Sequence, residues 1–399
     1  MLYKEDIKSG NMLSALGLGC MRFPGTLGNI DMQKAEAVVM EAIQSGINFF
    51  DTAYIYPGSE VALGKILAKN NIRDKVFVAT KLPLFKCRNY NDFDKFFYQQ
   101  LERLQTNYID YYFMHNITQL ADWSRLQSLG IEDWLAEKRA SGEVKSIGFS
   151  YHGTRDVFPI LLEMYNWDFC MIQYNYVNTN YQAGESGLKL AHAKGMSVFI
   201  MEPLLGGMLA RELPKAALNV IARYEASEGK GQPKKSPAGW ALTWLWNQPE
   251  VTMVLSGMGT TDQVKENATY ATNAKDNGMS QHELQVIEKV AKIFSDSYKI
   301  PCTGCGYCLP CPAKISIPEC FMSYNSSYAI SRMTGIQQFA TSSGALTRGF
   351  SILDCTKCGK CEKACPQEIK IVQELTTVRK RLEPWWYRAG VAIARKFMR

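Results

Sequence analysis

The cysteines carry the strongest chemical signal in the chain, because nine of the 12 fall between residues 302 and 365 of 399. Residues 302–312 have the pattern C-x2-C-x2-C-x2-C-P, and residues 355–366 have the pattern C-x2-C-x2-C-x3-C-P. The second pattern is the ligand run of 4Fe–4S clusters, and the first is one residue shorter before its last cysteine. Two such clusters are therefore predicted. Their ligands would be Cys302, Cys305, Cys308, Cys311, Cys355, Cys358, Cys361 and Cys365.

The two runs are expected to exchange one ligand each. Three thiolates on a tight turn can reach three corners of one cube, and a fourth, held away by proline, ligates the other cluster in such pairs. One cluster would take Cys302, Cys305, Cys308 and Cys365, and the other Cys355, Cys358, Cys361 and Cys311. Zinc is the alternative, since C-x2-C pairs also build zinc ribbons, but zinc rarely uses two consecutive runs of four.

The rest of this region also fits a cluster domain. The 43 residues between the two runs exceed what a compact bacterial ferredoxin would need and resemble the helical type of two-cluster ferredoxin domain. Cysteines outside the runs usually behave as small buried side chains. Packed thiols are therefore predicted at Cys20, Cys87, Cys170 and Cys320.

A second group of residues that could do chemistry lies in the first third of the chain. Asp51, Lys81 and His115 each come at the end of an apolar run of the kind that forms a buried strand, and Tyr56 follows five residues after Asp51. Taken singly each signal is weak, because a lone histidine or a charge after a strand usually has no catalytic role. On one rim beside a tyrosine, they could bind a polar substrate and move protons.

The elements that must position these residues are visible as eight apolar runs. They cover residues 13–21, 47–52, 75–81, 108–116, 144–150, 168–175, 196–203 and 250–257. Helix-like segments such as 31–46 and 91–104 separate them, and continuous apolar strands indicate a parallel sheet buried on both faces. Eight such units over about 250 residues predict a closed (β/α)8 TIM barrel. A doubly wound open sheet is the alternative, although no G-x-G-x-x-G follows the first strand.

Over about residues 12–270 the chain resembles the aldo-keto reductases. The matching stretches are NFFDTAYIYPGSE, VFVATKLP, YIDYYFMHN, VKSIGFS and VTMVLSGMGTTDQVKEN. The resemblance implies an NAD(P)H-dependent oxidoreductase of small-molecule carbonyls or alcohols. It places the family's catalytic tetrad at Asp51, Tyr56, Lys81 and His115. Together with the cysteine runs, the whole chain resembles the iron–sulfur-containing branch of that family.

The tetrad has a physical rationale. A carbonyl that accepts hydride becomes an alkoxide and needs a proton, but a tyrosine with a pKa near 10 is a poor acid–base catalyst at neutral pH. A Lys81 cation would favour the phenolate of Tyr56, and Asp51 would hold that cation in place. His115 would donate a hydrogen bond to the substrate oxygen. The hydride must come from a cofactor, because no side chain supplies one.

The resemblance also implies residues that bind the nicotinamide end of the cofactor. Ser150 and Gln173 match two of the three residues that hold the nicotinamide amide in the family, whereas Tyr151 replaces the third, an asparagine. Met201 stands where an aromatic residue commonly stacks on the nicotinamide ring.

The loop after the eighth strand differs further from the family pattern. Gly257 and Gln263 stand where the family has a lysine and an arginine on the 2′-phosphate, while Glu266 and Asn267 match the family. A dianionic phosphate without cations loses its charge-assisted partners. NAD(H) is therefore favoured over NADP(H), and another redox cofactor stays open.

Composition divides the chain into three predicted regions. These are a barrel at residues 1–298, a two-cluster 4Fe–4S domain at 299–372 and a basic amphipathic tail at 373–399. Seven basic residues and one acidic residue between 379 and 399 account for most of the formal charge of +7, so a global nucleic-acid-binding surface is not indicated. The tail could touch a membrane surface or an acidic redox partner, but packing against its own protein is favoured.

Three functions remain open. The barrel could be a nicotinamide-dependent carbonyl reductase with accessory clusters, or the clusters could exchange electrons with the barrel site or a redox protein partner. Alternatively, the barrel could be a scaffold for a ferredoxin-linked electron-transfer protein. The complete tetrad favours the first. A cytoplasmic location is expected, because no signal peptide or 18-residue apolar run is found and the cysteines suit a reducing compartment.

Overall fold

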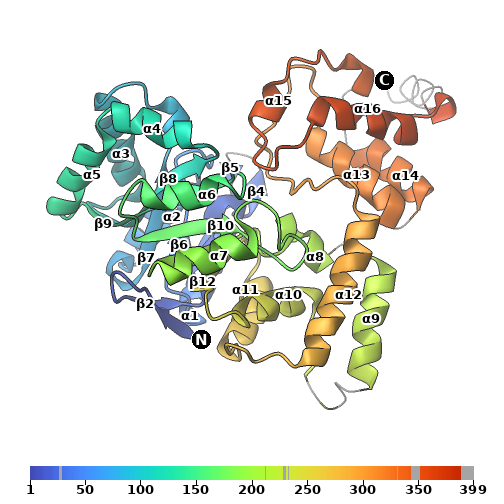
Figure 1. Cartoon of the computed structure of the whole chain (residues 1–399), viewed down its shortest axis with the longest axis horizontal. Helices are drawn as coiled ribbons and strands as arrows, with labels where there is room; N and C mark the ends of the chain where they lie inside the picture. The colour runs from blue at the N-terminus through green and yellow to red at the C-terminus, as the bar shows by residue number, and fades with distance from the viewer. Residues whose placement is uncertain are drawn as a thin grey trace. The chain divides into compact units, whose positions relative to one another are not determined.

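The structure is a computed structural model that describes residues 1–26, 29–211, 213–227, 231, 233–329, 331–342 and 351–387. Its internal contacts divide the chain into two compact units, Met1–Leu204 with Ala238–Ser280 and Leu205–Pro237 with Gln281–Arg399. Both are drawn in Figure 1. The units follow packing and not chain order, so the domain limits at residues 298 and 372 stay predictions.

In the described part of the first unit, eight parallel strands close into a barrel, in the order β10-β11-β12-β3-β6-β7-β8-β9. The strands are β3 (Leu16–Gly19), β6 (Phe49–Asp51), β7 (Phe77–Leu82), β8 (Ile109–Ile117), β9 (Val144–Tyr151), β10 (Phe169–Gln173), β11 (Ser197–Met201) and β12 (Met253–Ser256). Each coincides with one apolar run to within two residues at its C-terminal end. The predicted (β/α)8 barrel is confirmed, and the open doubly wound sheet is wrong.

Helices follow the strands and cover the outside of the barrel. They are α1 (Met32–Gln44), α2 (Ser59–Lys69), α3 (Asn91–Leu104), α4 (Leu120–Ser128), α5 (Ile131–Ala140), α6 (Val157–Glu163), α7 (Gly184–Ala193), α10 (Pro237–Trp246) and α11 (Thr261–Thr272). Asp31 caps the first turn of α1 by accepting the Lys34 N–H at 3.1 Å. The apolar face of α1 is buried at Ala35, Val38, Val39 and Ala42.

Aromatic rings fill the inside of the barrel. The Phe113 and Phe169 ring centroids are 4.7 Å apart, and Phe169 stacks on Phe199 at 5.2 Å. Phe49 contacts Tyr111 at 5.0 Å. Because side chains alternate along a strand, residues two positions later point to the same interior. Because Phe49 and Phe113 point inward, the polar residues two positions after them also point inward, at the C-terminal ends of β6 and β8.

A hairpin of β1 (Tyr3–Glu5) and β2 (Met12–Ser14) precedes the barrel, and a smaller one pairs β4 (Gly25–Thr26) with β5 (Asn29–Ile30). Next to the first hairpin, the buried Asp6 accepts hydrogen bonds from the Tyr111 hydroxyl at 2.9 Å and the Ser197 hydroxyl at 2.5 Å. These bonds fix the N-terminal end of the barrel, away from the rim on which the polar side chains gather.

The second unit is helical in its described residues. Its helices are α8 (Met208–Arg211), α9 (Lys215–Ala226), α12 (Gln281–Ser297), α13 (Ile317–Ala329), α14 (Arg332–Ser342), α15 (Lys360–Lys363) and α16 (Ile371–Leu382). Helix α12 packs against α9 and α13. Phe321, Phe339 and Val378 are fully buried between the last helices. The expected helical character of the cysteine-bearing region is therefore confirmed.

Part of the basic tail has a structural task. Arg381 of α16 donates to the Ser327 hydroxyl at 2.5 Å and to the Ser327 carbonyl at 2.9 Å, and its guanidinium lies 3.7 Å from the Tyr328 ring centroid. It thereby ties α16 to α13. Residues 388–399, which include most of the predicted amphipathic face, lie outside the described residues. Among those described, no helix is long and apolar enough to cross a bilayer.

Candidate active site and metal centre

The predicted tetrad comes together at the C-terminal rim of the barrel. Asp51 is the last residue of β6, and Lys81 and His115 lie near the ends of β7 and β8. The Lys81 ammonium is 2.5 Å from Asp51 Oδ1 and donates to the Thr52 carbonyl at 2.7 Å. The Lys81 side chain is only 2% exposed, so this ion pair is held away from water.

Tyr56 completes the group from the loop between β6 and α2. Its ring centroid lies 5.1 Å from the Lys81 ammonium and 6.0 Å from the His115 ring centroid, with the two rings nearly perpendicular. Hydrogen bonds from the Tyr56 N–H to Ala53 and from the Ser59 N–H to Tyr56 fold this loop tightly. Tyr56 is half-buried, whereas His115 is buried. The tyrosine is therefore the tetrad side chain most open to a substrate.

Burial sets the charge state of these groups. Burial raises the pKa of Asp51 and lowers the pKa of Lys81, while the attraction within the ion pair opposes both shifts. The pKa of His115 lies well below its usual range, mainly because the ring is buried and also because the Lys81 cation is near. His115 is therefore a neutral imidazole at neutral pH, with one N–H to donate.

A buried polar network behind the tetrad was missed by the sequence analysis. The Glu60 carboxylate, at the start of α2, accepts hydrogen bonds from Thr80 at 2.6 Å, Gln100 at 2.8 Å and Arg103 at 3.0 Å. Gln100 also donates to the Lys81 carbonyl at 3.1 Å. The network thus fixes β7 next to Lys81. Glu60 stands inside the matched stretch NFFDTAYIYPGSE, which is the signal that could have found it.

Two of the predicted nicotinamide-binding residues lie buried at the ends of neighbouring strands. Ser150 ends β9 with Tyr151, and its Oγ accepts the Asn116 N–H at 2.8 Å, which leaves its own hydroxyl proton to donate. Gln173 is the last residue of β10, the strand paired with β9. Both are 1% exposed.

Tyr151, which replaces the family's asparagine, does not lie beside the tetrad, whereas its neighbour His152 does. The Tyr151 ring packs 4.9 Å from Phe158 of α6, on the outer face of the barrel, and its hydroxyl donates to the Thr154 carbonyl. His152 is instead buried close enough to His115 to affect its charge, with Nδ1 3.3 Å from the Gln182 amide nitrogen. The imidazole of His152, and not the phenol of Tyr151, is therefore the side chain next to the tetrad.

Of the four remaining predicted cofactor residues, Gly257 lies in the loop after β12, and Gln263, Glu266 and Asn267 lie on α11. Asn267 donates to the Ser256 hydroxyl at 3.3 Å, and Gln263 accepts the Gly259 N–H at 2.8 Å. The Glu266 carboxylate is 3.5 Å from the hydroxyl of Tyr270. These contacts are internal to the loop and to α11, so they order the loop. The fourth residue, Gly257, contributes no side chain.

A cation that the sequence analysis missed lies over Gly257. A Cβ placed on this glycine would be 3.2 Å from Cδ of Arg22, an exposed residue of the short 3-10 helix (Cys20–Arg22) after β3. Strands β3 and β12 are neighbours in the barrel, which brings the two segments together. The cofactor loop therefore has one arginine beside it, although both family cations are replaced.

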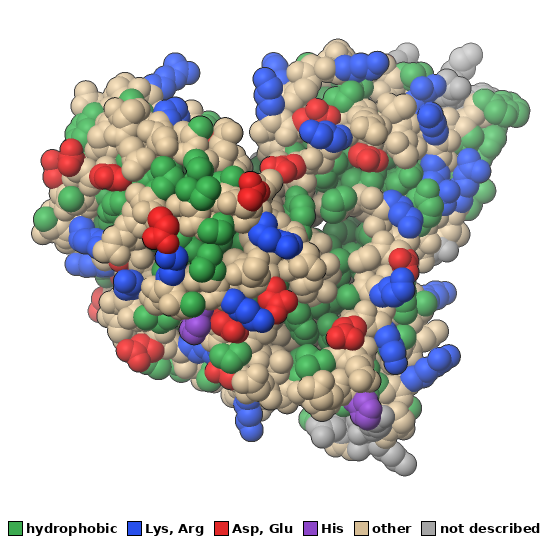
Figure 2. Space-filling model, in the orientation of Figure 1, with side chains coloured by type: hydrophobic (Ala, Val, Ile, Leu, Met, Phe, Trp, Pro, Cys, Tyr) green, Lys and Arg blue, Asp and Glu red, His purple; other side chains and the backbone are tan. Residues whose placement is uncertain are grey.

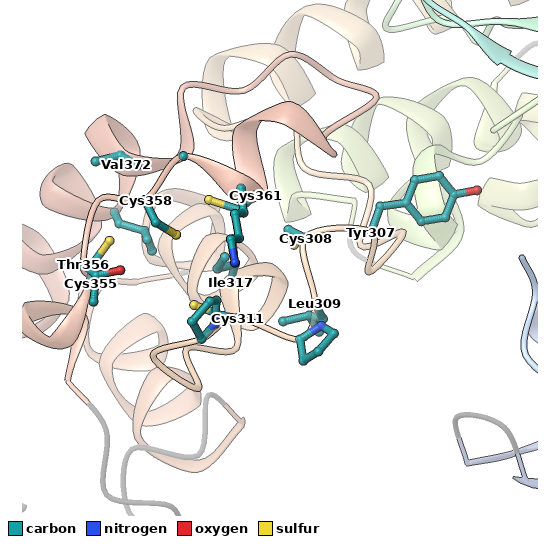
Figure 3. A pocket seen from close by; sticks show the side chains of 15 residues that line it. Tyr307, Cys308, Leu309, Cys311, Ile317, Cys355, Thr356, Cys358, Cys361 and Val372 are labelled. Carbon is teal, nitrogen blue, oxygen red and sulfur yellow. The ribbon is translucent and has the colours of Figure 1, made fainter. Parts of the chain in front are cut away.

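In the second unit, the eight motif cysteines line two cavities. The cavity in Figure 3 is bordered by Cys308, Cys311, Cys355, Cys358 and Cys361. The other is bordered by Cys302, Cys305, Cys308 and Cys365. Apart from Cys308, which borders both, the two sets are those expected from the spacing. Cys320 is fully buried and borders neither cavity.

The loops between these cysteines are open turns. Gly304, Gly306 and Gly359 have φ between 68° and 80°, and nothing lies within 4 Å of a Cβ placed on any of them. Zinc would need four donors about 2.0–2.3 Å from one ion. Among the described side chains, no three of His, Cys, Asp or Glu are arranged to hold a single metal ion. Two cavities bordered by thiols on glycine turns fit clusters better than single ions.

Comparison with known families agrees with both halves of the chain. Residues 15–290 match the aldo/keto reductase family, and residues 301–370 match the 4Fe-4S dicluster domain. The first match covers well over half of the chain and contains the whole tetrad. The second contains all eight motif cysteines.

Individual relatives match the barrel. L-galactose dehydrogenase of Arabidopsis thaliana is 29% identical over 306 residues, which cover 71% of this chain and 92% of the relative. L-glyceraldehyde 3-phosphate reductase of Escherichia coli is 25% identical over 315 residues, which cover 68% of this chain and 88% of the relative.

Solved structures share the barrel fold. The holo form of an aldo-keto reductase from Bacillus halodurans is 26% identical and has a TM-score of 0.59, covering 73% of this chain and 97% of that one. An aldo-keto reductase from Klebsiella pneumoniae in complex with NADPH is 19% identical and has a TM-score of 0.57, covering 73% and 96%. The chain belongs to the aldo/keto reductase family, and its barrel is followed by a 4Fe-4S dicluster domain.

Proposed function

We propose that the barrel catalyses nicotinamide-dependent reduction of a small-molecule carbonyl, or the reverse oxidation of an alcohol, with Tyr56 as the proton donor. The observation that carries this proposal is the position of Tyr56, half-buried beside the Lys81 ammonium and the neutral His115. A bound nicotinamide would supply the hydride.

Each remaining tetrad residue has one task in this proposal. Lys81 favours release of the Tyr56 proton to the developing alkoxide, because a nearby cation stabilises the phenolate left behind. Asp51, 2.5 Å from that ammonium, keeps it charged and in place. His115 is neutral and donates its N–H to the substrate oxygen, which orients the carbonyl and stabilises negative charge.

The cofactor would lie along the rim from β9 to β12. Ser150 and Gln173 fit the amide of nicotinamide, since both are buried polar side chains at adjacent strand ends. The loop of Gly257, Gln263, Glu266 and Asn267 would take the adenosine end. NAD(H) is the favoured cofactor, because neither family cation is present and Glu266 opposes an added phosphate. Arg22, whose side-chain carbons lie near Gly257, is a cation through which NADP(H) could bind.

The relatives support a proposal for the substrate class. Their names, L-galactose dehydrogenase and L-glyceraldehyde 3-phosphate reductase, direct the search toward hydroxylated aldehydes and sugars. In the second unit, the eight motif cysteines would hold two 4Fe–4S clusters in the crosswise arrangement described above. Such clusters pass single electrons when bound, so they would serve electron transfer or an accessory role beside the barrel reaction.

The test compares Tyr56→Phe with the unmodified holo-protein, both prepared without oxygen and matched for iron. Removing one oxygen while keeping the ring should leave folding and nicotinamide binding intact. Turnover of an accepted aldehyde should fall by about 10² to 10⁴-fold, the range of general acid catalysis. Lys81→Met should also impair turnover and move its pH optimum. Full turnover by Tyr56→Phe with the clusters still required would instead make the barrel a scaffold for electron transfer.

A further inference from the structure

The charge of this chain is concentrated in its last quarter. Residues 299–399 contain 15 Lys and Arg and six Asp and Glu, a balance of +9, whereas the whole chain has a formal charge of +7. Two oxidised clusters of about −2 each would leave this part clearly positive. A field of one sign attracts partners of the opposite sign and speeds their encounter.

Five lysines lie close in sequence to the cysteines of the cavity in Figure 3. We call them the lysine rim: Lys314, Lys357, Lys360, Lys363 and Lys370, all of them exposed. Lys360 itself borders the cavity. Within the described part of the chain, none of the five ammonium groups forms an ion pair with a carboxylate. Figure 2 shows Lys and Arg side chains gathered over the C-terminal helices.

Two acidic side chains in the same region accept hydrogen bonds from backbone N–H groups. Asp354 accepts the Ser351 N–H at 2.7 Å, and Glu362 accepts the Val372 N–H at 2.9 Å. Such bonds fix carboxylates against the chain and stabilise their charge locally. The lysine ammonium groups, in contrast, extend into solvent, where an approaching molecule meets them first.

Lys357 immediately precedes Cys358 and Lys360 follows it by two residues, so the lysine rim includes cations next in sequence to the most accessible of the predicted ligands. Cys358 is exposed, while the other seven motif cysteines are partly covered. A cluster held by Cys358 would therefore come nearer to solvent at this turn than at any other of its ligands. The surface thus combines an accessible metal ligand with a set of cations.

We propose that the lysine rim is the docking surface for an acidic one-electron carrier protein of the flavodoxin or ferredoxin class. Cations grouped around an exposed cluster ligand fit such a carrier, whose own redox group must come close to the cluster. An anionic membrane would satisfy the lysines but gain nothing from the exposed Cys358. The proposal does not depend on the reaction assigned to the barrel.

The test measures binding of an acidic flavodoxin with oxidised FMN to the immobilised holo-protein. The variant Lys357→Gln, Lys360→Gln, Lys363→Gln should bind about tenfold more weakly, mainly through slower association, because charges at the edge of an interface chiefly set the on-rate. The difference should disappear at about 0.5 M salt, where screening shortens the range of exposed charges. Iron content and the cluster absorption spectrum must match the unmodified protein.

A matched control loses three exposed lysines from the barrel unit: Lys65→Gln, Lys75→Gln, Lys95→Gln. It should bind the flavodoxin as the unmodified protein does, and so should Tyr56→Phe. If the rim variant loses iron, Lys314→Gln with Lys370→Gln tests the same surface outside the second cysteine run. Unchanged binding by the rim variants would overturn the proposal. Equal weakening by the control, or rim-dependent binding of phosphatidylglycerol vesicles without flavodoxin binding, would do so as well.

Discussion

Lys81 is the side chain on which the candidate active site depends. Its ammonium contacts the Asp51 carboxylate and the Thr52 carbonyl and faces the Tyr56 ring, in a position almost closed to water. Taking a lysine out of water is costly unless a partner compensates, and Asp51 supplies that partner. Loss of Asp51 would therefore remove charge from Lys81 and, through it, the stabilisation of the Tyr56 phenolate.

The two imidazoles at the rim make stability depend on pH. Burial lowers the pKa of His152 to about 4, so between pH 4 and about 6.5 the unfolded chain binds the proton that the folded chain excludes. The contribution of the neutral His152 to stability is therefore complete above about pH 6.5 and is lost as the pH falls below that value.

We predict that His152→Gln removes part of this loss. Between pH 7.5 and pH 5.5 the free energy of unfolding of the unmodified protein should fall by about 1 kcal/mol more than that of the variant. Urea unfolding of both proteins at the two pH values measures the difference. His282→Gln, at an exposed histidine in α12, is the control. Parallel pH profiles for His152→Gln and the unmodified protein would contradict the prediction.

The cofactor loop offers a second test at the residue scale. NADH should bind at least as well as NADPH, and Gly257→Lys with Gln263→Arg should shift the preference toward NADPH by roughly 1–3 kcal/mol, the scale of charge-assisted hydrogen bonds. The flexible Arg22 side chain beside Gly257 can move to admit the new lysine.

Fluorescence titration with both nucleotides measures this shift, and Arg22→Gln separates the two explanations of any affinity for NADPH. If the unmodified protein prefers NADPH and Arg22→Gln abolishes that preference, Arg22 reads the 2′-phosphate. A strong NADPH preference that survives Arg22→Gln would show that the loop has been aligned wrongly with the family.

At the element scale, α2 and α3 hold the tetrad from outside the barrel. Glu60 of α2 bonds with Gln100 and Arg103 of α3, and the Arg103 guanidinium lies 4.3 Å from the Tyr54 ring centroid, two residues before Tyr56. One network therefore fixes both the strand of Lys81 and the loop of the proposed proton donor.

Glu60→Gln should weaken this network, because it leaves the Arg103 cation without its partner. We expect a loss of about 1–3 kcal/mol in the free energy of unfolding and a fall in kcat larger than the change in KM. The matched control is Glu36→Gln, which breaks the more exposed pair between Glu36 and Lys69 and should change stability much less. Equal effects of the two substitutions on stability and kcat would refute a positioning role for Glu60.

The strands were predictable because each is a continuous apolar run, and their common polar ends predicted that the tetrad would meet. The polar network was not predictable, because Glu60, Gln100 and Arg103 lie on two helices and their contacts depend on how those helices pack. The same holds for Tyr151 and His152. A one-residue difference in where β9 ends decides which of them faces the rim, and apolar patterning does not resolve single residues.

At the scale of the whole molecule, packing groups segments that are far apart in the sequence. Residues 205–237 leave the barrel between β11 and β12, and α9 from this segment packs against α12 of the cysteine-bearing unit. The sequence pattern of amphipathic helices such as α9 and α12 shows which face is buried, but it does not show which element covers that face. The sequence therefore suggested a boundary at one point along the chain, whereas each compact unit combines segments that are far apart in the sequence.

The metal content tests the assignment of the second unit. Protein prepared without oxygen should contain about eight iron and eight sulfide per chain, as two cubanes require. Cys358→Ser should lower both to about four and destabilise the second unit, because cluster binding and folding are coupled. Cys320→Ala is the matched control, since this thiol is buried nearby but borders neither cavity, and it should keep all eight iron atoms.

The distribution of loss among the other cysteines tests the crosswise assignment. Cys311 borders the same cavity as Cys355, Cys358 and Cys361, so Cys311→Ser should reproduce the partial loss of Cys358→Ser, and the double variant should lose no more than either one. Combining Cys358→Ser with Cys365→Ser should instead remove both clusters, because Cys365 borders the other cavity. Finding stoichiometric zinc and no acid-labile sulfide would contradict the assignment of both clusters. Additive loss for Cys311 and Cys358 would show that each run ligates its own cluster.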